Sequence, residues 1–397
     1  MRCLKTQMRY VPRRIEEQLL RATKAFPAVV LTGPRRAGKT MLLRRAFPGA
    51  SYHLFEDPDV VARFRADPQG FLDALPLPAI LDEIQYVPEV FRYVRARIDA
   101  DPRRTGRWLL AGSQEAGLMQ HVTESMAARA AVLQLWPLSA QETQKVNLLH
   151  GGYPEVLARP RAARLWFSSY LQTYLERDVR TMTAVQDLAT FRRFFALVAS
   201  RHGQVLNRSD LAAPLGISVP TVQRWISALE TTGQILLLPP FYENFGKRLV
   251  KSPKLYVADS GLACHLLGID TEAELKKSPF RGALFEGLVA CELVKQQANA
   301  GLRREVWWFR DQQGLEVDFV VPARGGGLRL IEAKAGSSVR PEAVVPMQRL
   351  AQAIAKSGRR GAVEMVLVHE PAKGSKRGPI GVAEGVTAVG WRELGLD

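Results

Sequence analysis

The chain has 397 residues, an ordinary hydrophobic share of 47% and a formal net charge of +16 at pH 7. This length predicts two or three domains, and the lack of any run near the ~20 apolar residues that span a bilayer excludes a membrane-spanning protein. The cysteines Cys3, Cys264 and Cys291 are far apart and form no CxxC pair, which indicates a reduced, cytoplasmic protein without a structural zinc site.

The N-terminal segment 1–48 is strongly basic, with 12 Lys or Arg and 2 Glu, a net charge of +10 (12 − 2). Residues 1–10 contain no apolar core, so a secretion signal is not expected. An excess of this size is typical of proteins that bind nucleic acid or another polyanion. The alternative is an Arg-rich proteome whose basic faces are only solvated, and charge alone does not separate the two.

Residues 33–40, GPRRAGKT, match the phosphate-binding pattern GxxxxGKT. The apolar run 28–32 before them predicts a buried strand, and residues 41–46 suit a helix, whose N-terminus favours an anion. A chance glycine turn is the alternative. The residues that we expect to bind ATP belong to this loop and the position after it: Gly33, Arg35, Arg36, Ala37, Gly38, Lys39, Thr40 and Met41.

Two residues of this loop have specific expected roles. Lys39 is expected to reach the β- and γ-phosphates, and the Thr40 hydroxyl to ligate Mg²⁺. The apolar run 78–81 ends in Asp82 and Glu83, a Walker B pattern. Asp82 would hold Mg²⁺ through water, and Glu83 would polarise the attacking water. A strand that ends at a solvated acidic turn is the alternative, and the nearby phosphate-binding motif disfavours it.

The apolar runs 28–32, 79–82 and 107–112 alternate with helical patterns, which predicts a parallel α/β sheet. The phosphate site of such a sheet lies at the carboxyl ends of its strands. Ser113 and Gln114 follow the third run, so they are candidates to contact the γ-phosphate or the attacking water. Ordinary turn chemistry after a strand is the alternative.

Residues 207–231 resemble a helix-turn-helix, with Gly216 in the turn and Ser218 as the N-cap of the second helix. Apolar residues at helical spacing predict the buried face of that helix: Val222, Trp225, Ile226 and Leu229. Four polar residues would face outward: Thr221, Gln223, Arg224 and Ser227. With a wing formed by 235–238 and 255–257, this unit could enter a DNA major groove or serve protein contacts.

The C-terminal part contains two candidate strands joined by a glycine-rich loop. Residues 316–321 alternate as a strand, 328–334 form another, and 322–327 contain three glycines. We therefore expect a β-hairpin in which Val321 pairs with Arg329.

This register has a chemical consequence. It places Asp318 opposite Glu332, with Cβ atoms about 5 Å apart, and Lys334 two residues further along the same face. Two carboxylates and a lysine so placed can bind a divalent metal and activate water for phosphodiester cleavage. Glu286, on a helix-like segment, could join them. The alternative is a plain cross-strand ion pair, because the same register places Lys334 opposite Glu316.

Further motifs are spread along the chain: LFEDPD at 54–59, LLAGSQ at 109–114, LWPLSAQE at 135–142, GGYPEVL at 151–157, YLERDVR at 174–180, SPKLYVADSGL at 252–262 and FEGLVACELV at 285–294. With the motifs above, they make nearly the whole chain resemble an uncharacterised group of prokaryotic AAA-superfamily ATPases with a C-terminal domain of unknown function. The resemblance implies a nuclease-like C-terminal domain of the PD-(D/E)xK type. In that pattern Glu286, Asp318, Glu332 and Lys334 match the metal-site positions, with the lysine as catalytic partner.

The same resemblance singles out Arg129. The family usually shows Gly-Arg where this chain has Ala128-Arg129, so Arg129 is the candidate for an arginine that contacts the γ-phosphate, in cis or from a neighbouring chain. A surface salt bridge is the alternative.

The expected fold class is α/β: a P-loop NTPase core with a parallel sheet, then a helical and winged-helix region, then an α/β restriction-endonuclease-like domain. The expected domains are 1–145, 146–275 and 276–397. ATP and Mg²⁺ are the expected cofactors. One functional hypothesis is an ATP-gated enzyme that cuts nucleic acid. The other is a nucleotide-dependent switch whose C-terminal parts only bind DNA or a protein partner.

Overall fold

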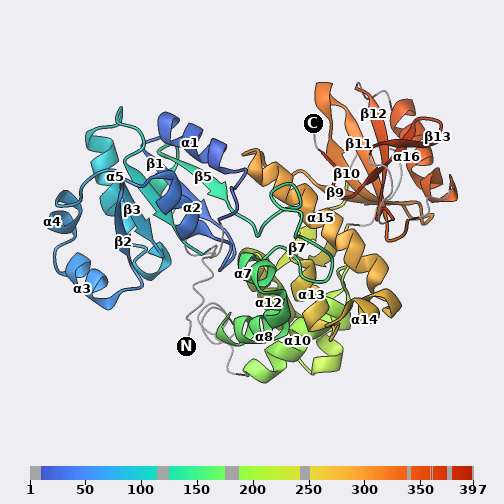
Figure 1. Ribbon diagram of the computed structural model, residues 1–397, viewed down its shortest axis with the longest axis horizontal. Coiled ribbons are helices and arrows are strands. Elements are labelled where there is room, and N and C mark those ends of the chain that lie inside the picture. The colour runs from blue at the N-terminus through green and yellow to red at the C-terminus, as the bar shows by residue number, and fades with distance from the viewer. Residues whose placement is uncertain are drawn as a thin grey trace, which may run out of the picture.

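The computed structural model describes residues 10–113, 125–174, 187–241, 251–337, 341–357, 359, 361–372 and 378–395. Within these ranges no helix combines the length and apolar character needed to cross a membrane. The chain forms an N-terminal part, a mostly helical middle part and a C-terminal sheet, which are blue, green to yellow and red in Figure 1.

The N-terminal part is a parallel sheet with strand order β2-β3-β4-β1-β5. Its strands are β1 (Ala28–Thr32), β2 (Ser51–Leu54), β3 (Ala79–Asp82), β4 (Trp108–Ala111) and β5 (Ala130–Gln134). Its helices are α1 (Glu16–Ala25), α2 (Lys39–Ala46), α3 (Pro58–Ala66), α4 (Pro68–Asp73), the short η1 (Ile84–Tyr86) and α5 (Val90–Ala100). Strands β1, β3 and β4 are buried along their whole length, as their apolar sequences predict. The predicted parallel α/β core is therefore confirmed.

The middle part packs short helices around a small antiparallel sheet of order β6-β8-β7. The strands are β6 (Gln204–Val205), β7 (Ile235–Leu238) and β8 (Lys254–Val257). The helices are α7 (Pro154–Ala158), η2 (Pro160–Ala162), α8 (Ala163–Tyr174), α10 (Leu188–Ser200), α11 (Arg208–Ala212), η4 (Ala213–Leu215), α12 (Val219–Thr231), α13 (Ser260–Leu266) and α14 (Glu272–Lys277). Strand β8 lies in the centre, so its backbone is paired on both sides.

Helices α11 and α12 follow the predicted helix-turn-helix pattern. Gly216 ends the first helix with a left-handed φ of 64°, and the Ser218 hydroxyl accepts a hydrogen bond from the Thr221 N–H at 3.2 Å. All four predicted core positions of α12 are buried. On the opposite face Gln223 and Arg224 are exposed, and β7 pairs with β8 where the wing was expected. Binding of DNA by this unit stays a prediction.

The C-terminal part is a mixed sheet of order β13-β14-β12-β11-β10-β9. Its strands are β9 (Trp307–Arg310), β10 (Glu316–Pro322), β11 (Leu328–Lys334), β12 (Val363–His369), β13 (Ile380–Ala383) and β14 (Val386–Gly390). The helical segments are α15 (Arg281–Asn299), η5 (Arg324–Gly326), η6 (Pro341–Val344) and α16 (Val345–Lys356). Strands β10 and β11 pair in the predicted register, with Val321 opposite Arg329. Helices α15 and α16 cover opposite faces of this sheet.

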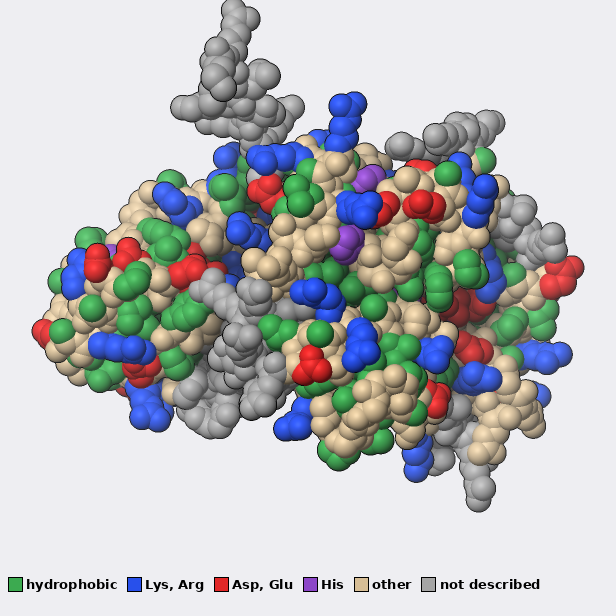
Figure 2. Space-filling view, turned by 90° about the horizontal axis from the view of Figure 1, so that it is seen from below, with side chains coloured by type: hydrophobic (Ala, Val, Ile, Leu, Met, Phe, Trp, Pro, Cys, Tyr) green, Lys and Arg blue, Asp and Glu red, His purple; other side chains and the backbone are tan. Residues whose placement is uncertain are grey.

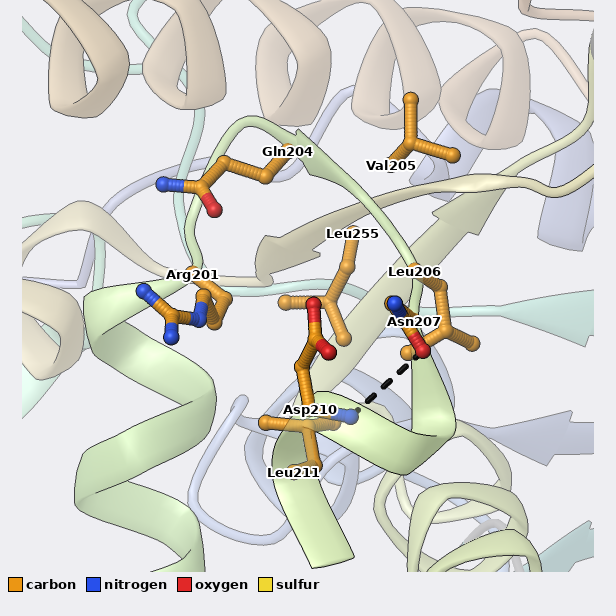
Figure 3. A pocket seen from close by; sticks show the side chains of 8 residues that line it. All are labelled: Arg201, Gln204, Val205, Leu206, Asn207, Asp210, Leu211 and Leu255. Carbon is orange, nitrogen blue, oxygen red and sulfur yellow. Dashed lines mark hydrogen bonds between the residues drawn. The ribbon is translucent and has the colours of Figure 1, made fainter. Parts of the chain in front are cut away.

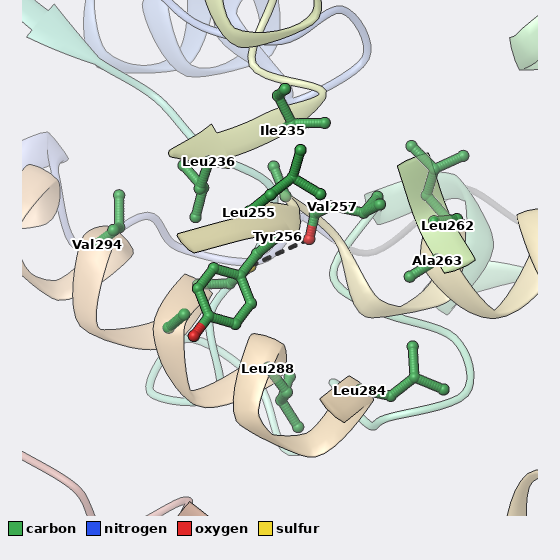
Figure 4. Packing of buried hydrophobic residues seen from close by; sticks show 14 of the residues in the cluster. Ile235, Leu236, Leu255, Tyr256, Val257, Leu262, Ala263, Leu284, Leu288 and Val294 are labelled. Carbon is green, nitrogen blue, oxygen red and sulfur yellow. Dashed lines mark hydrogen bonds between the residues drawn. The ribbon is translucent and has the colours of Figure 1, made fainter. Parts of the chain in front are cut away.

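The middle and C-terminal parts share one hydrophobic core. A single cluster of buried side chains joins Tyr256 of β8, Leu288 of α15 and Phe319 of β10, and Figure 4 shows β8 lying over α15. Helix α15 is apolar and buried around most of its circumference because it is covered from both sides. A second cluster, between the sheet and α16, consists of residues 309–388 and Phe241, so only the α15 face of the sheet shares its core with the middle part. The domain boundaries proposed from the sequence stay a prediction.

Candidate functional sites

The phosphate-binding motif forms a tight loop between β1 and α2. Gly33 has a φ of 143°, and a Cβ there would lie 2.0 Å from the Leu135 carbonyl oxygen, so only glycine fits. Gly38 precedes α2 with a φ of 103°. The buried Lys39 Nζ donates hydrogen bonds to the carbonyl oxygens of Gly33 and Pro34, each at 3.0 Å. The lysine thus lies inside the loop that would surround a phosphate.

The remaining predicted nucleotide-binding residues surround this loop. Arg35 donates to the Tyr86 hydroxyl at 3.3 Å, and Arg36 adopts a left-handed φ of 62°. Ala37 is buried, whereas Met41 is 60% exposed on the first turn of α2. Their contact with a nucleotide stays a prediction.

The predicted magnesium ligands lie side by side. The Thr40 hydroxyl donates to the Asp82 carboxylate at 2.6 Å, and the Tyr52 hydroxyl donates to the same oxygen at 3.0 Å. Burial raises the pKa of Asp82, and the hydrogen bond from Thr40 opposes this shift. A hydroxyl and a carboxylate in this position are the oxygen ligands that Mg²⁺ prefers. Tyr52 was not predicted, because an aromatic residue in an edge strand carries no motif.

Glu83 connects to the neighbouring strand end through a glutamine. It adopts a left-handed φ of 55°, a strained conformation for a glutamate. Its carboxylate accepts a hydrogen bond from the Gln85 amide, whose oxygen accepts the Ser113 N–H at 3.2 Å. The Ser113 hydroxyl is buried and has no hydrogen-bond partner among the described residues. Glu83 and Ser113 therefore meet at the carboxyl edge of the sheet, whereas Gln114 lies outside the described residues.

Arg129 lies at the opposite edge of the sheet. It directly precedes β5, and its carbonyl oxygen accepts the N–H of Ala28, the first residue of β1. The five residues of β1 span roughly 16 Å before the phosphate-binding loop begins. The guanidinium instead pairs with Asp99, which raises the pKa of Arg129. The prediction that Arg129 contacts the γ-phosphate in cis is wrong, since a rigid strand separates them. A role toward a neighbouring chain stays a prediction.

The residue before Arg129 has a strained backbone. Ala128 adopts a φ of 61°, a left-handed conformation that costs an L-residue roughly 1–2 kcal/mol and costs glycine little. A glycine at position 128 would relieve that strain.

Sequence reasoning missed Arg13, a buried residue that braces the phosphate-binding loop. Its guanidinium donates to the carbonyl oxygens of Ala37 at 2.8 Å and Trp136 at 2.6 Å, and pairs with Glu142 at 3.0 Å. One cation thus joins the loop, the end of β5 and the chain that leaves the sheet. An arginine in a basic N-terminal segment gives no sign of burial, so this role was not evident from the sequence.

The chain that leaves β5 contacts α15. The Ala140 N–H donates to Glu292 of α15 at 2.7 Å, and Lys295 donates to the Leu138 carbonyl oxygen at 3.0 Å. Glu292 and Lys295 also pair with each other at 3.0 Å in a buried setting. Figure 1 shows α15 running from the N-terminal part toward the middle helices. Helix α15 therefore contacts the N-terminal part near one end and carries Glu286 near the other.

The four C-terminal residues of the nuclease-like pattern come together. Asp318 accepts the Ala333 N–H at 2.9 Å, and Glu332 accepts from Lys334 at 2.6 Å. Burial and the nearby Asp318 raise the pKa values of both Glu286 and Glu332 to about 7. The second carboxylate oxygen of Glu332 is buried and has no hydrogen-bond partner among the described residues. The resemblance therefore identified residues that are neighbours in space.

A residue from the middle part, Lys254, enters this cluster. Its Nζ lies 2.7 Å from Glu286, 2.7 Å from Glu316 and 3.6 Å from Asp318. Burial lowers the pKa of Lys254, but the three carboxylates raise it by more, so the ammonium stays charged. The available signal was a lysine that opens the otherwise apolar strand KLYV.

Lys254 alters both interpretations of the cluster. The predicted pair between Glu316 and Lys334 is not the arrangement found, because Glu316 pairs with Lys254 and with Arg310 at 3.6 Å. In the described part of the chain, no three His, Cys, Asp or Glu side chains gather in a way that could hold a metal ion. As folded, the cluster does not fit a metal, because a lysine stands among its carboxylates.

A small pocket of about 260 Å³ lies beside the helix-turn-helix. Figure 3 shows Arg201, Gln204 and Asp210 at this pocket, with the Asn207 side chain accepting the Asp210 N–H at 3.4 Å. That bond caps α11. None of the predicted catalytic residues lines the pocket.

Comparison with known proteins identifies the family of this chain. Residues 25–144 match the family described as AAA domain, and residues 141–273 and 281–376 match domains of unknown function DUF8612 and DUF4143. The uncharacterised proteins Rv2008c of Mycobacterium tuberculosis and Mb2031c of Mycobacterium bovis are each 33% identical over 315 residues, which cover 78% of this chain and 70% of theirs. The chain belongs to this family of uncharacterised AAA ATPases with a C-terminal domain of unknown function.

Solved structures resemble this AAA ATPase more distantly. The Walker-type ATPase PABY2304 of Pyrococcus abyssi is 15% identical with a TM-score of 0.43, over 64% of this chain and 94% of that one. RuvB of Thermotoga maritima is 15% identical with a TM-score of 0.31, over 57% and 89%. The assignment of residues 25–144 to an AAA domain rests on the family match, and the roles of the predicted nucleotide-site residues stay a prediction.

Proposed function

We propose that the chain hydrolyses ATP with Mg²⁺ at the carboxyl edge of the N-terminal sheet. The observation that carries this proposal is the convergence of the P-loop, Thr40, Asp82 and Glu83 at one edge, with Thr40 and Asp82 in direct contact at 2.6 Å. Membership of the AAA family supports it. We also propose domains 1–145, 146–275 and 276–397 and a cytoplasmic location.

Each side chain has one task in this proposal. Lys39 exchanges its bonds to loop carbonyls for the β- and γ-phosphates, which are stronger acceptors because they are charged. Thr40 and Asp82 hold Mg²⁺, which neutralises charge on the phosphates when it is bound. Glu83 orients the attacking water, and Ser113 offers its unpaired hydroxyl to the γ-phosphate or that water.

Calorimetric titration of ATP with Mg²⁺ tests this site. Lys39→Ala should weaken ATP binding by about 100-fold or more, because it removes a desolvated cation from a charge pair. Lys24→Ala removes an exposed lysine at the end of α1 and should leave the affinity unchanged. Wild-type affinity in Lys39→Ala would refute the site assignment.

We propose DNA as the partner of the middle part. The net charge of +16 and the exposed Gln223 and Arg224 on α12 support this. In Figure 2 the Lys and Arg side chains are scattered and interspersed with Asp and Glu, so the proposal rests on the net charge and on α12 and not on a basic patch of this face. Duplex affinity should fall with salt at a log–log slope of about −0.9 per phosphate contact. Arg224→Ala should lower the affinity, whereas Arg103→Ala, an exposed change in the N-terminal part, should not. A flat salt response would exclude DNA.

The gathering of Glu286, Asp318, Glu332 and Lys334 supports a second candidate function, metal-dependent nucleic-acid cleavage in a state in which Lys254 has left the carboxylates. Asp318→Ala should abolish cleavage of plasmid DNA if the cluster cuts. Absence of cleavage by the wild type, with and without ATP, would leave a binding domain.

A further inference from the structure

The carboxylate cluster already contains a cation that belongs to the chain. The Lys254 side chain is 4% exposed, and its Nζ contacts Glu286 of α15 and both Glu316 and Asp318 of β10. An ammonium group has three donors, and here three carboxylates from two elements surround it. A divalent cation would seek the same carboxylate oxygens.

Aromatic groups close the remaining sides of this lysine. Its Nζ lies 5.6 Å from the centre of the Trp308 ring, within the range of a cation–π contact. The Tyr256 hydroxyl, two residues along β8, donates to the same Glu286 oxygen at 2.5 Å. Lys254 is thus enclosed by groups from α15, β9 and β10.

The backbone holds this lysine in place. Strand β8 is paired on both sides, by β6 and β7. The chain after β7 also bonds to β9: the Phe241 N–H donates to the Trp308 carbonyl oxygen at 2.7 Å, and the Trp308 N–H to the Pro239 carbonyl oxygen at 3.2 Å. Lys254 therefore cannot leave the cluster unless the middle and C-terminal parts separate.

We propose that Lys254 is a built-in counter-ion that takes the place of a divalent metal and keeps the carboxylate cluster closed to metal ions in the folded chain. This inhibitory contact rests on the proposed nuclease-like site, and it deepens that proposal by naming what blocks it. One carboxylate oxygen of Glu332 has no hydrogen-bond partner in the part of the chain that the structure describes, so Lys254 and Lys334 do not satisfy every acceptor of the cluster. Removal of Lys254 would free three carboxylates for a cation at its position.

Titration of Mn²⁺ into the full-length, nucleotide-free protein by calorimetry tests the contact. Wild type should show no saturable binding up to 1 mM, a limit in the ordinary range of weak sites. Lys254→Ala should bind one Mn²⁺ at least about tenfold more tightly. Arg310→Met is the matched control, because it removes a cation that lies 3.6 Å from Glu316 and leaves Lys254 in position; it should behave as wild type. Asp318→Asn added to Lys254→Ala should abolish the new binding.

Other outcomes separate this contact from the nuclease-like site. Equal Mn²⁺ affinity in wild type and Lys254→Ala, lost in Asp318→Asn, would refute the block and leave an open metal site. Equal gains in Lys254→Ala and Arg310→Met would show that only net charge matters, which also refutes the block. Absence of binding in all folded variants would refute both the block and a metal-dependent site. Lys254→Gln, whose amide can still donate to Glu286, replaces Lys254→Ala if the latter does not fold.

Discussion

Two buried lysines, Lys39 in the N-terminal part and Lys254 in the C-terminal cluster, contact different kinds of acceptor. Lys39 donates to carbonyl oxygens of its own loop, five and six residues earlier. Lys254 is surrounded by carboxylates that follow it by 32, 62 and 64 residues. Lys254 is thus already neutralised by the chain's own carboxylates, whereas Lys39 lies in the loop where we propose that a phosphate binds.

The largest expected effect tests this contrast directly. Lys254→Met should lower the free energy of unfolding by about 4 kcal/mol, because it leaves buried carboxylates without their cation. The matched change Lys39→Met should cost less, about 2 kcal/mol, since the loop carbonyl oxygens that it leaves behind are neutral. Urea unfolding followed by tryptophan fluorescence measures both. Equal losses would contradict the distinction.

The contacts of Arg13 with the phosphate-binding loop provide a second test. Arg13→Ala should destabilise the chain by about 3 kcal/mol, because the buried Glu142 carboxylate loses its cation. It should also weaken ATP binding, since the Ala37 carbonyl of the loop loses its donor. The exposed neighbour Arg14 provides the control, as Arg14→Ala should stay within about 0.5 kcal/mol. Similar losses in both variants would exclude a bracing role.

His202 contacts β8, the strand that carries Lys254, and its protonation should lower the stability of the folded chain. Its Nδ1 accepts the Val257 N–H of β8 at 3.0 Å, and burial lowers the pKa of His202 to about 3. The unfolded chain, with a pKa near 6.5, then binds a proton that the folded ring does not. Stability should therefore fall as the pH decreases, by about 2 kcal/mol between pH 6.5 and 5. His202→Asn keeps an acceptor for the N–H and should reduce this fall. An unchanged pH dependence in the variant would assign the effect to other groups.

The smallest effect concerns backbone strain far from both lysines. Ala128→Gly should stabilise the chain by about 1 kcal/mol, because Ala128 holds a φ of 61°. Ala127→Gly, one residue earlier and without a positive φ, should instead cost stability. Melting temperatures measure both changes. A loss in Ala128→Gly would show that its conformation carries no strain.

The same contrast explains what the sequence could predict. The nucleotide site depends on contiguous motifs, so Lys39, Thr40, Asp82 and Glu83 were predicted together with the parallel sheet that positions them, although not with its strand order. The hairpin register was also predictable, because alternation and a glycine loop define it locally. Lys254 was not, since its role depends on packing between two distant parts of the chain.

For Arg129 the residue could be named from the sequence, but its position in the fold could not. The resemblance pointed to the residue, but its distance from the chain's own phosphate site follows from the direction of β5, which the motif does not encode. The sequence therefore identified this arginine but could not predict at which edge of the sheet it lies.

The most direct test of the central claim, an ATP-hydrolysing site at the carboxyl edge, is phosphate release with Mg²⁺ and ATP in wild type and Glu83→Gln, with ATP binding measured in parallel. We expect the variant to bind ATP as wild type does and to lose turnover by about 100-fold or more, because it keeps the shape of Glu83 without the charge that acts on water. A variant that hydrolyses ATP at the wild-type rate, or a wild type that binds no ATP, would contradict the account.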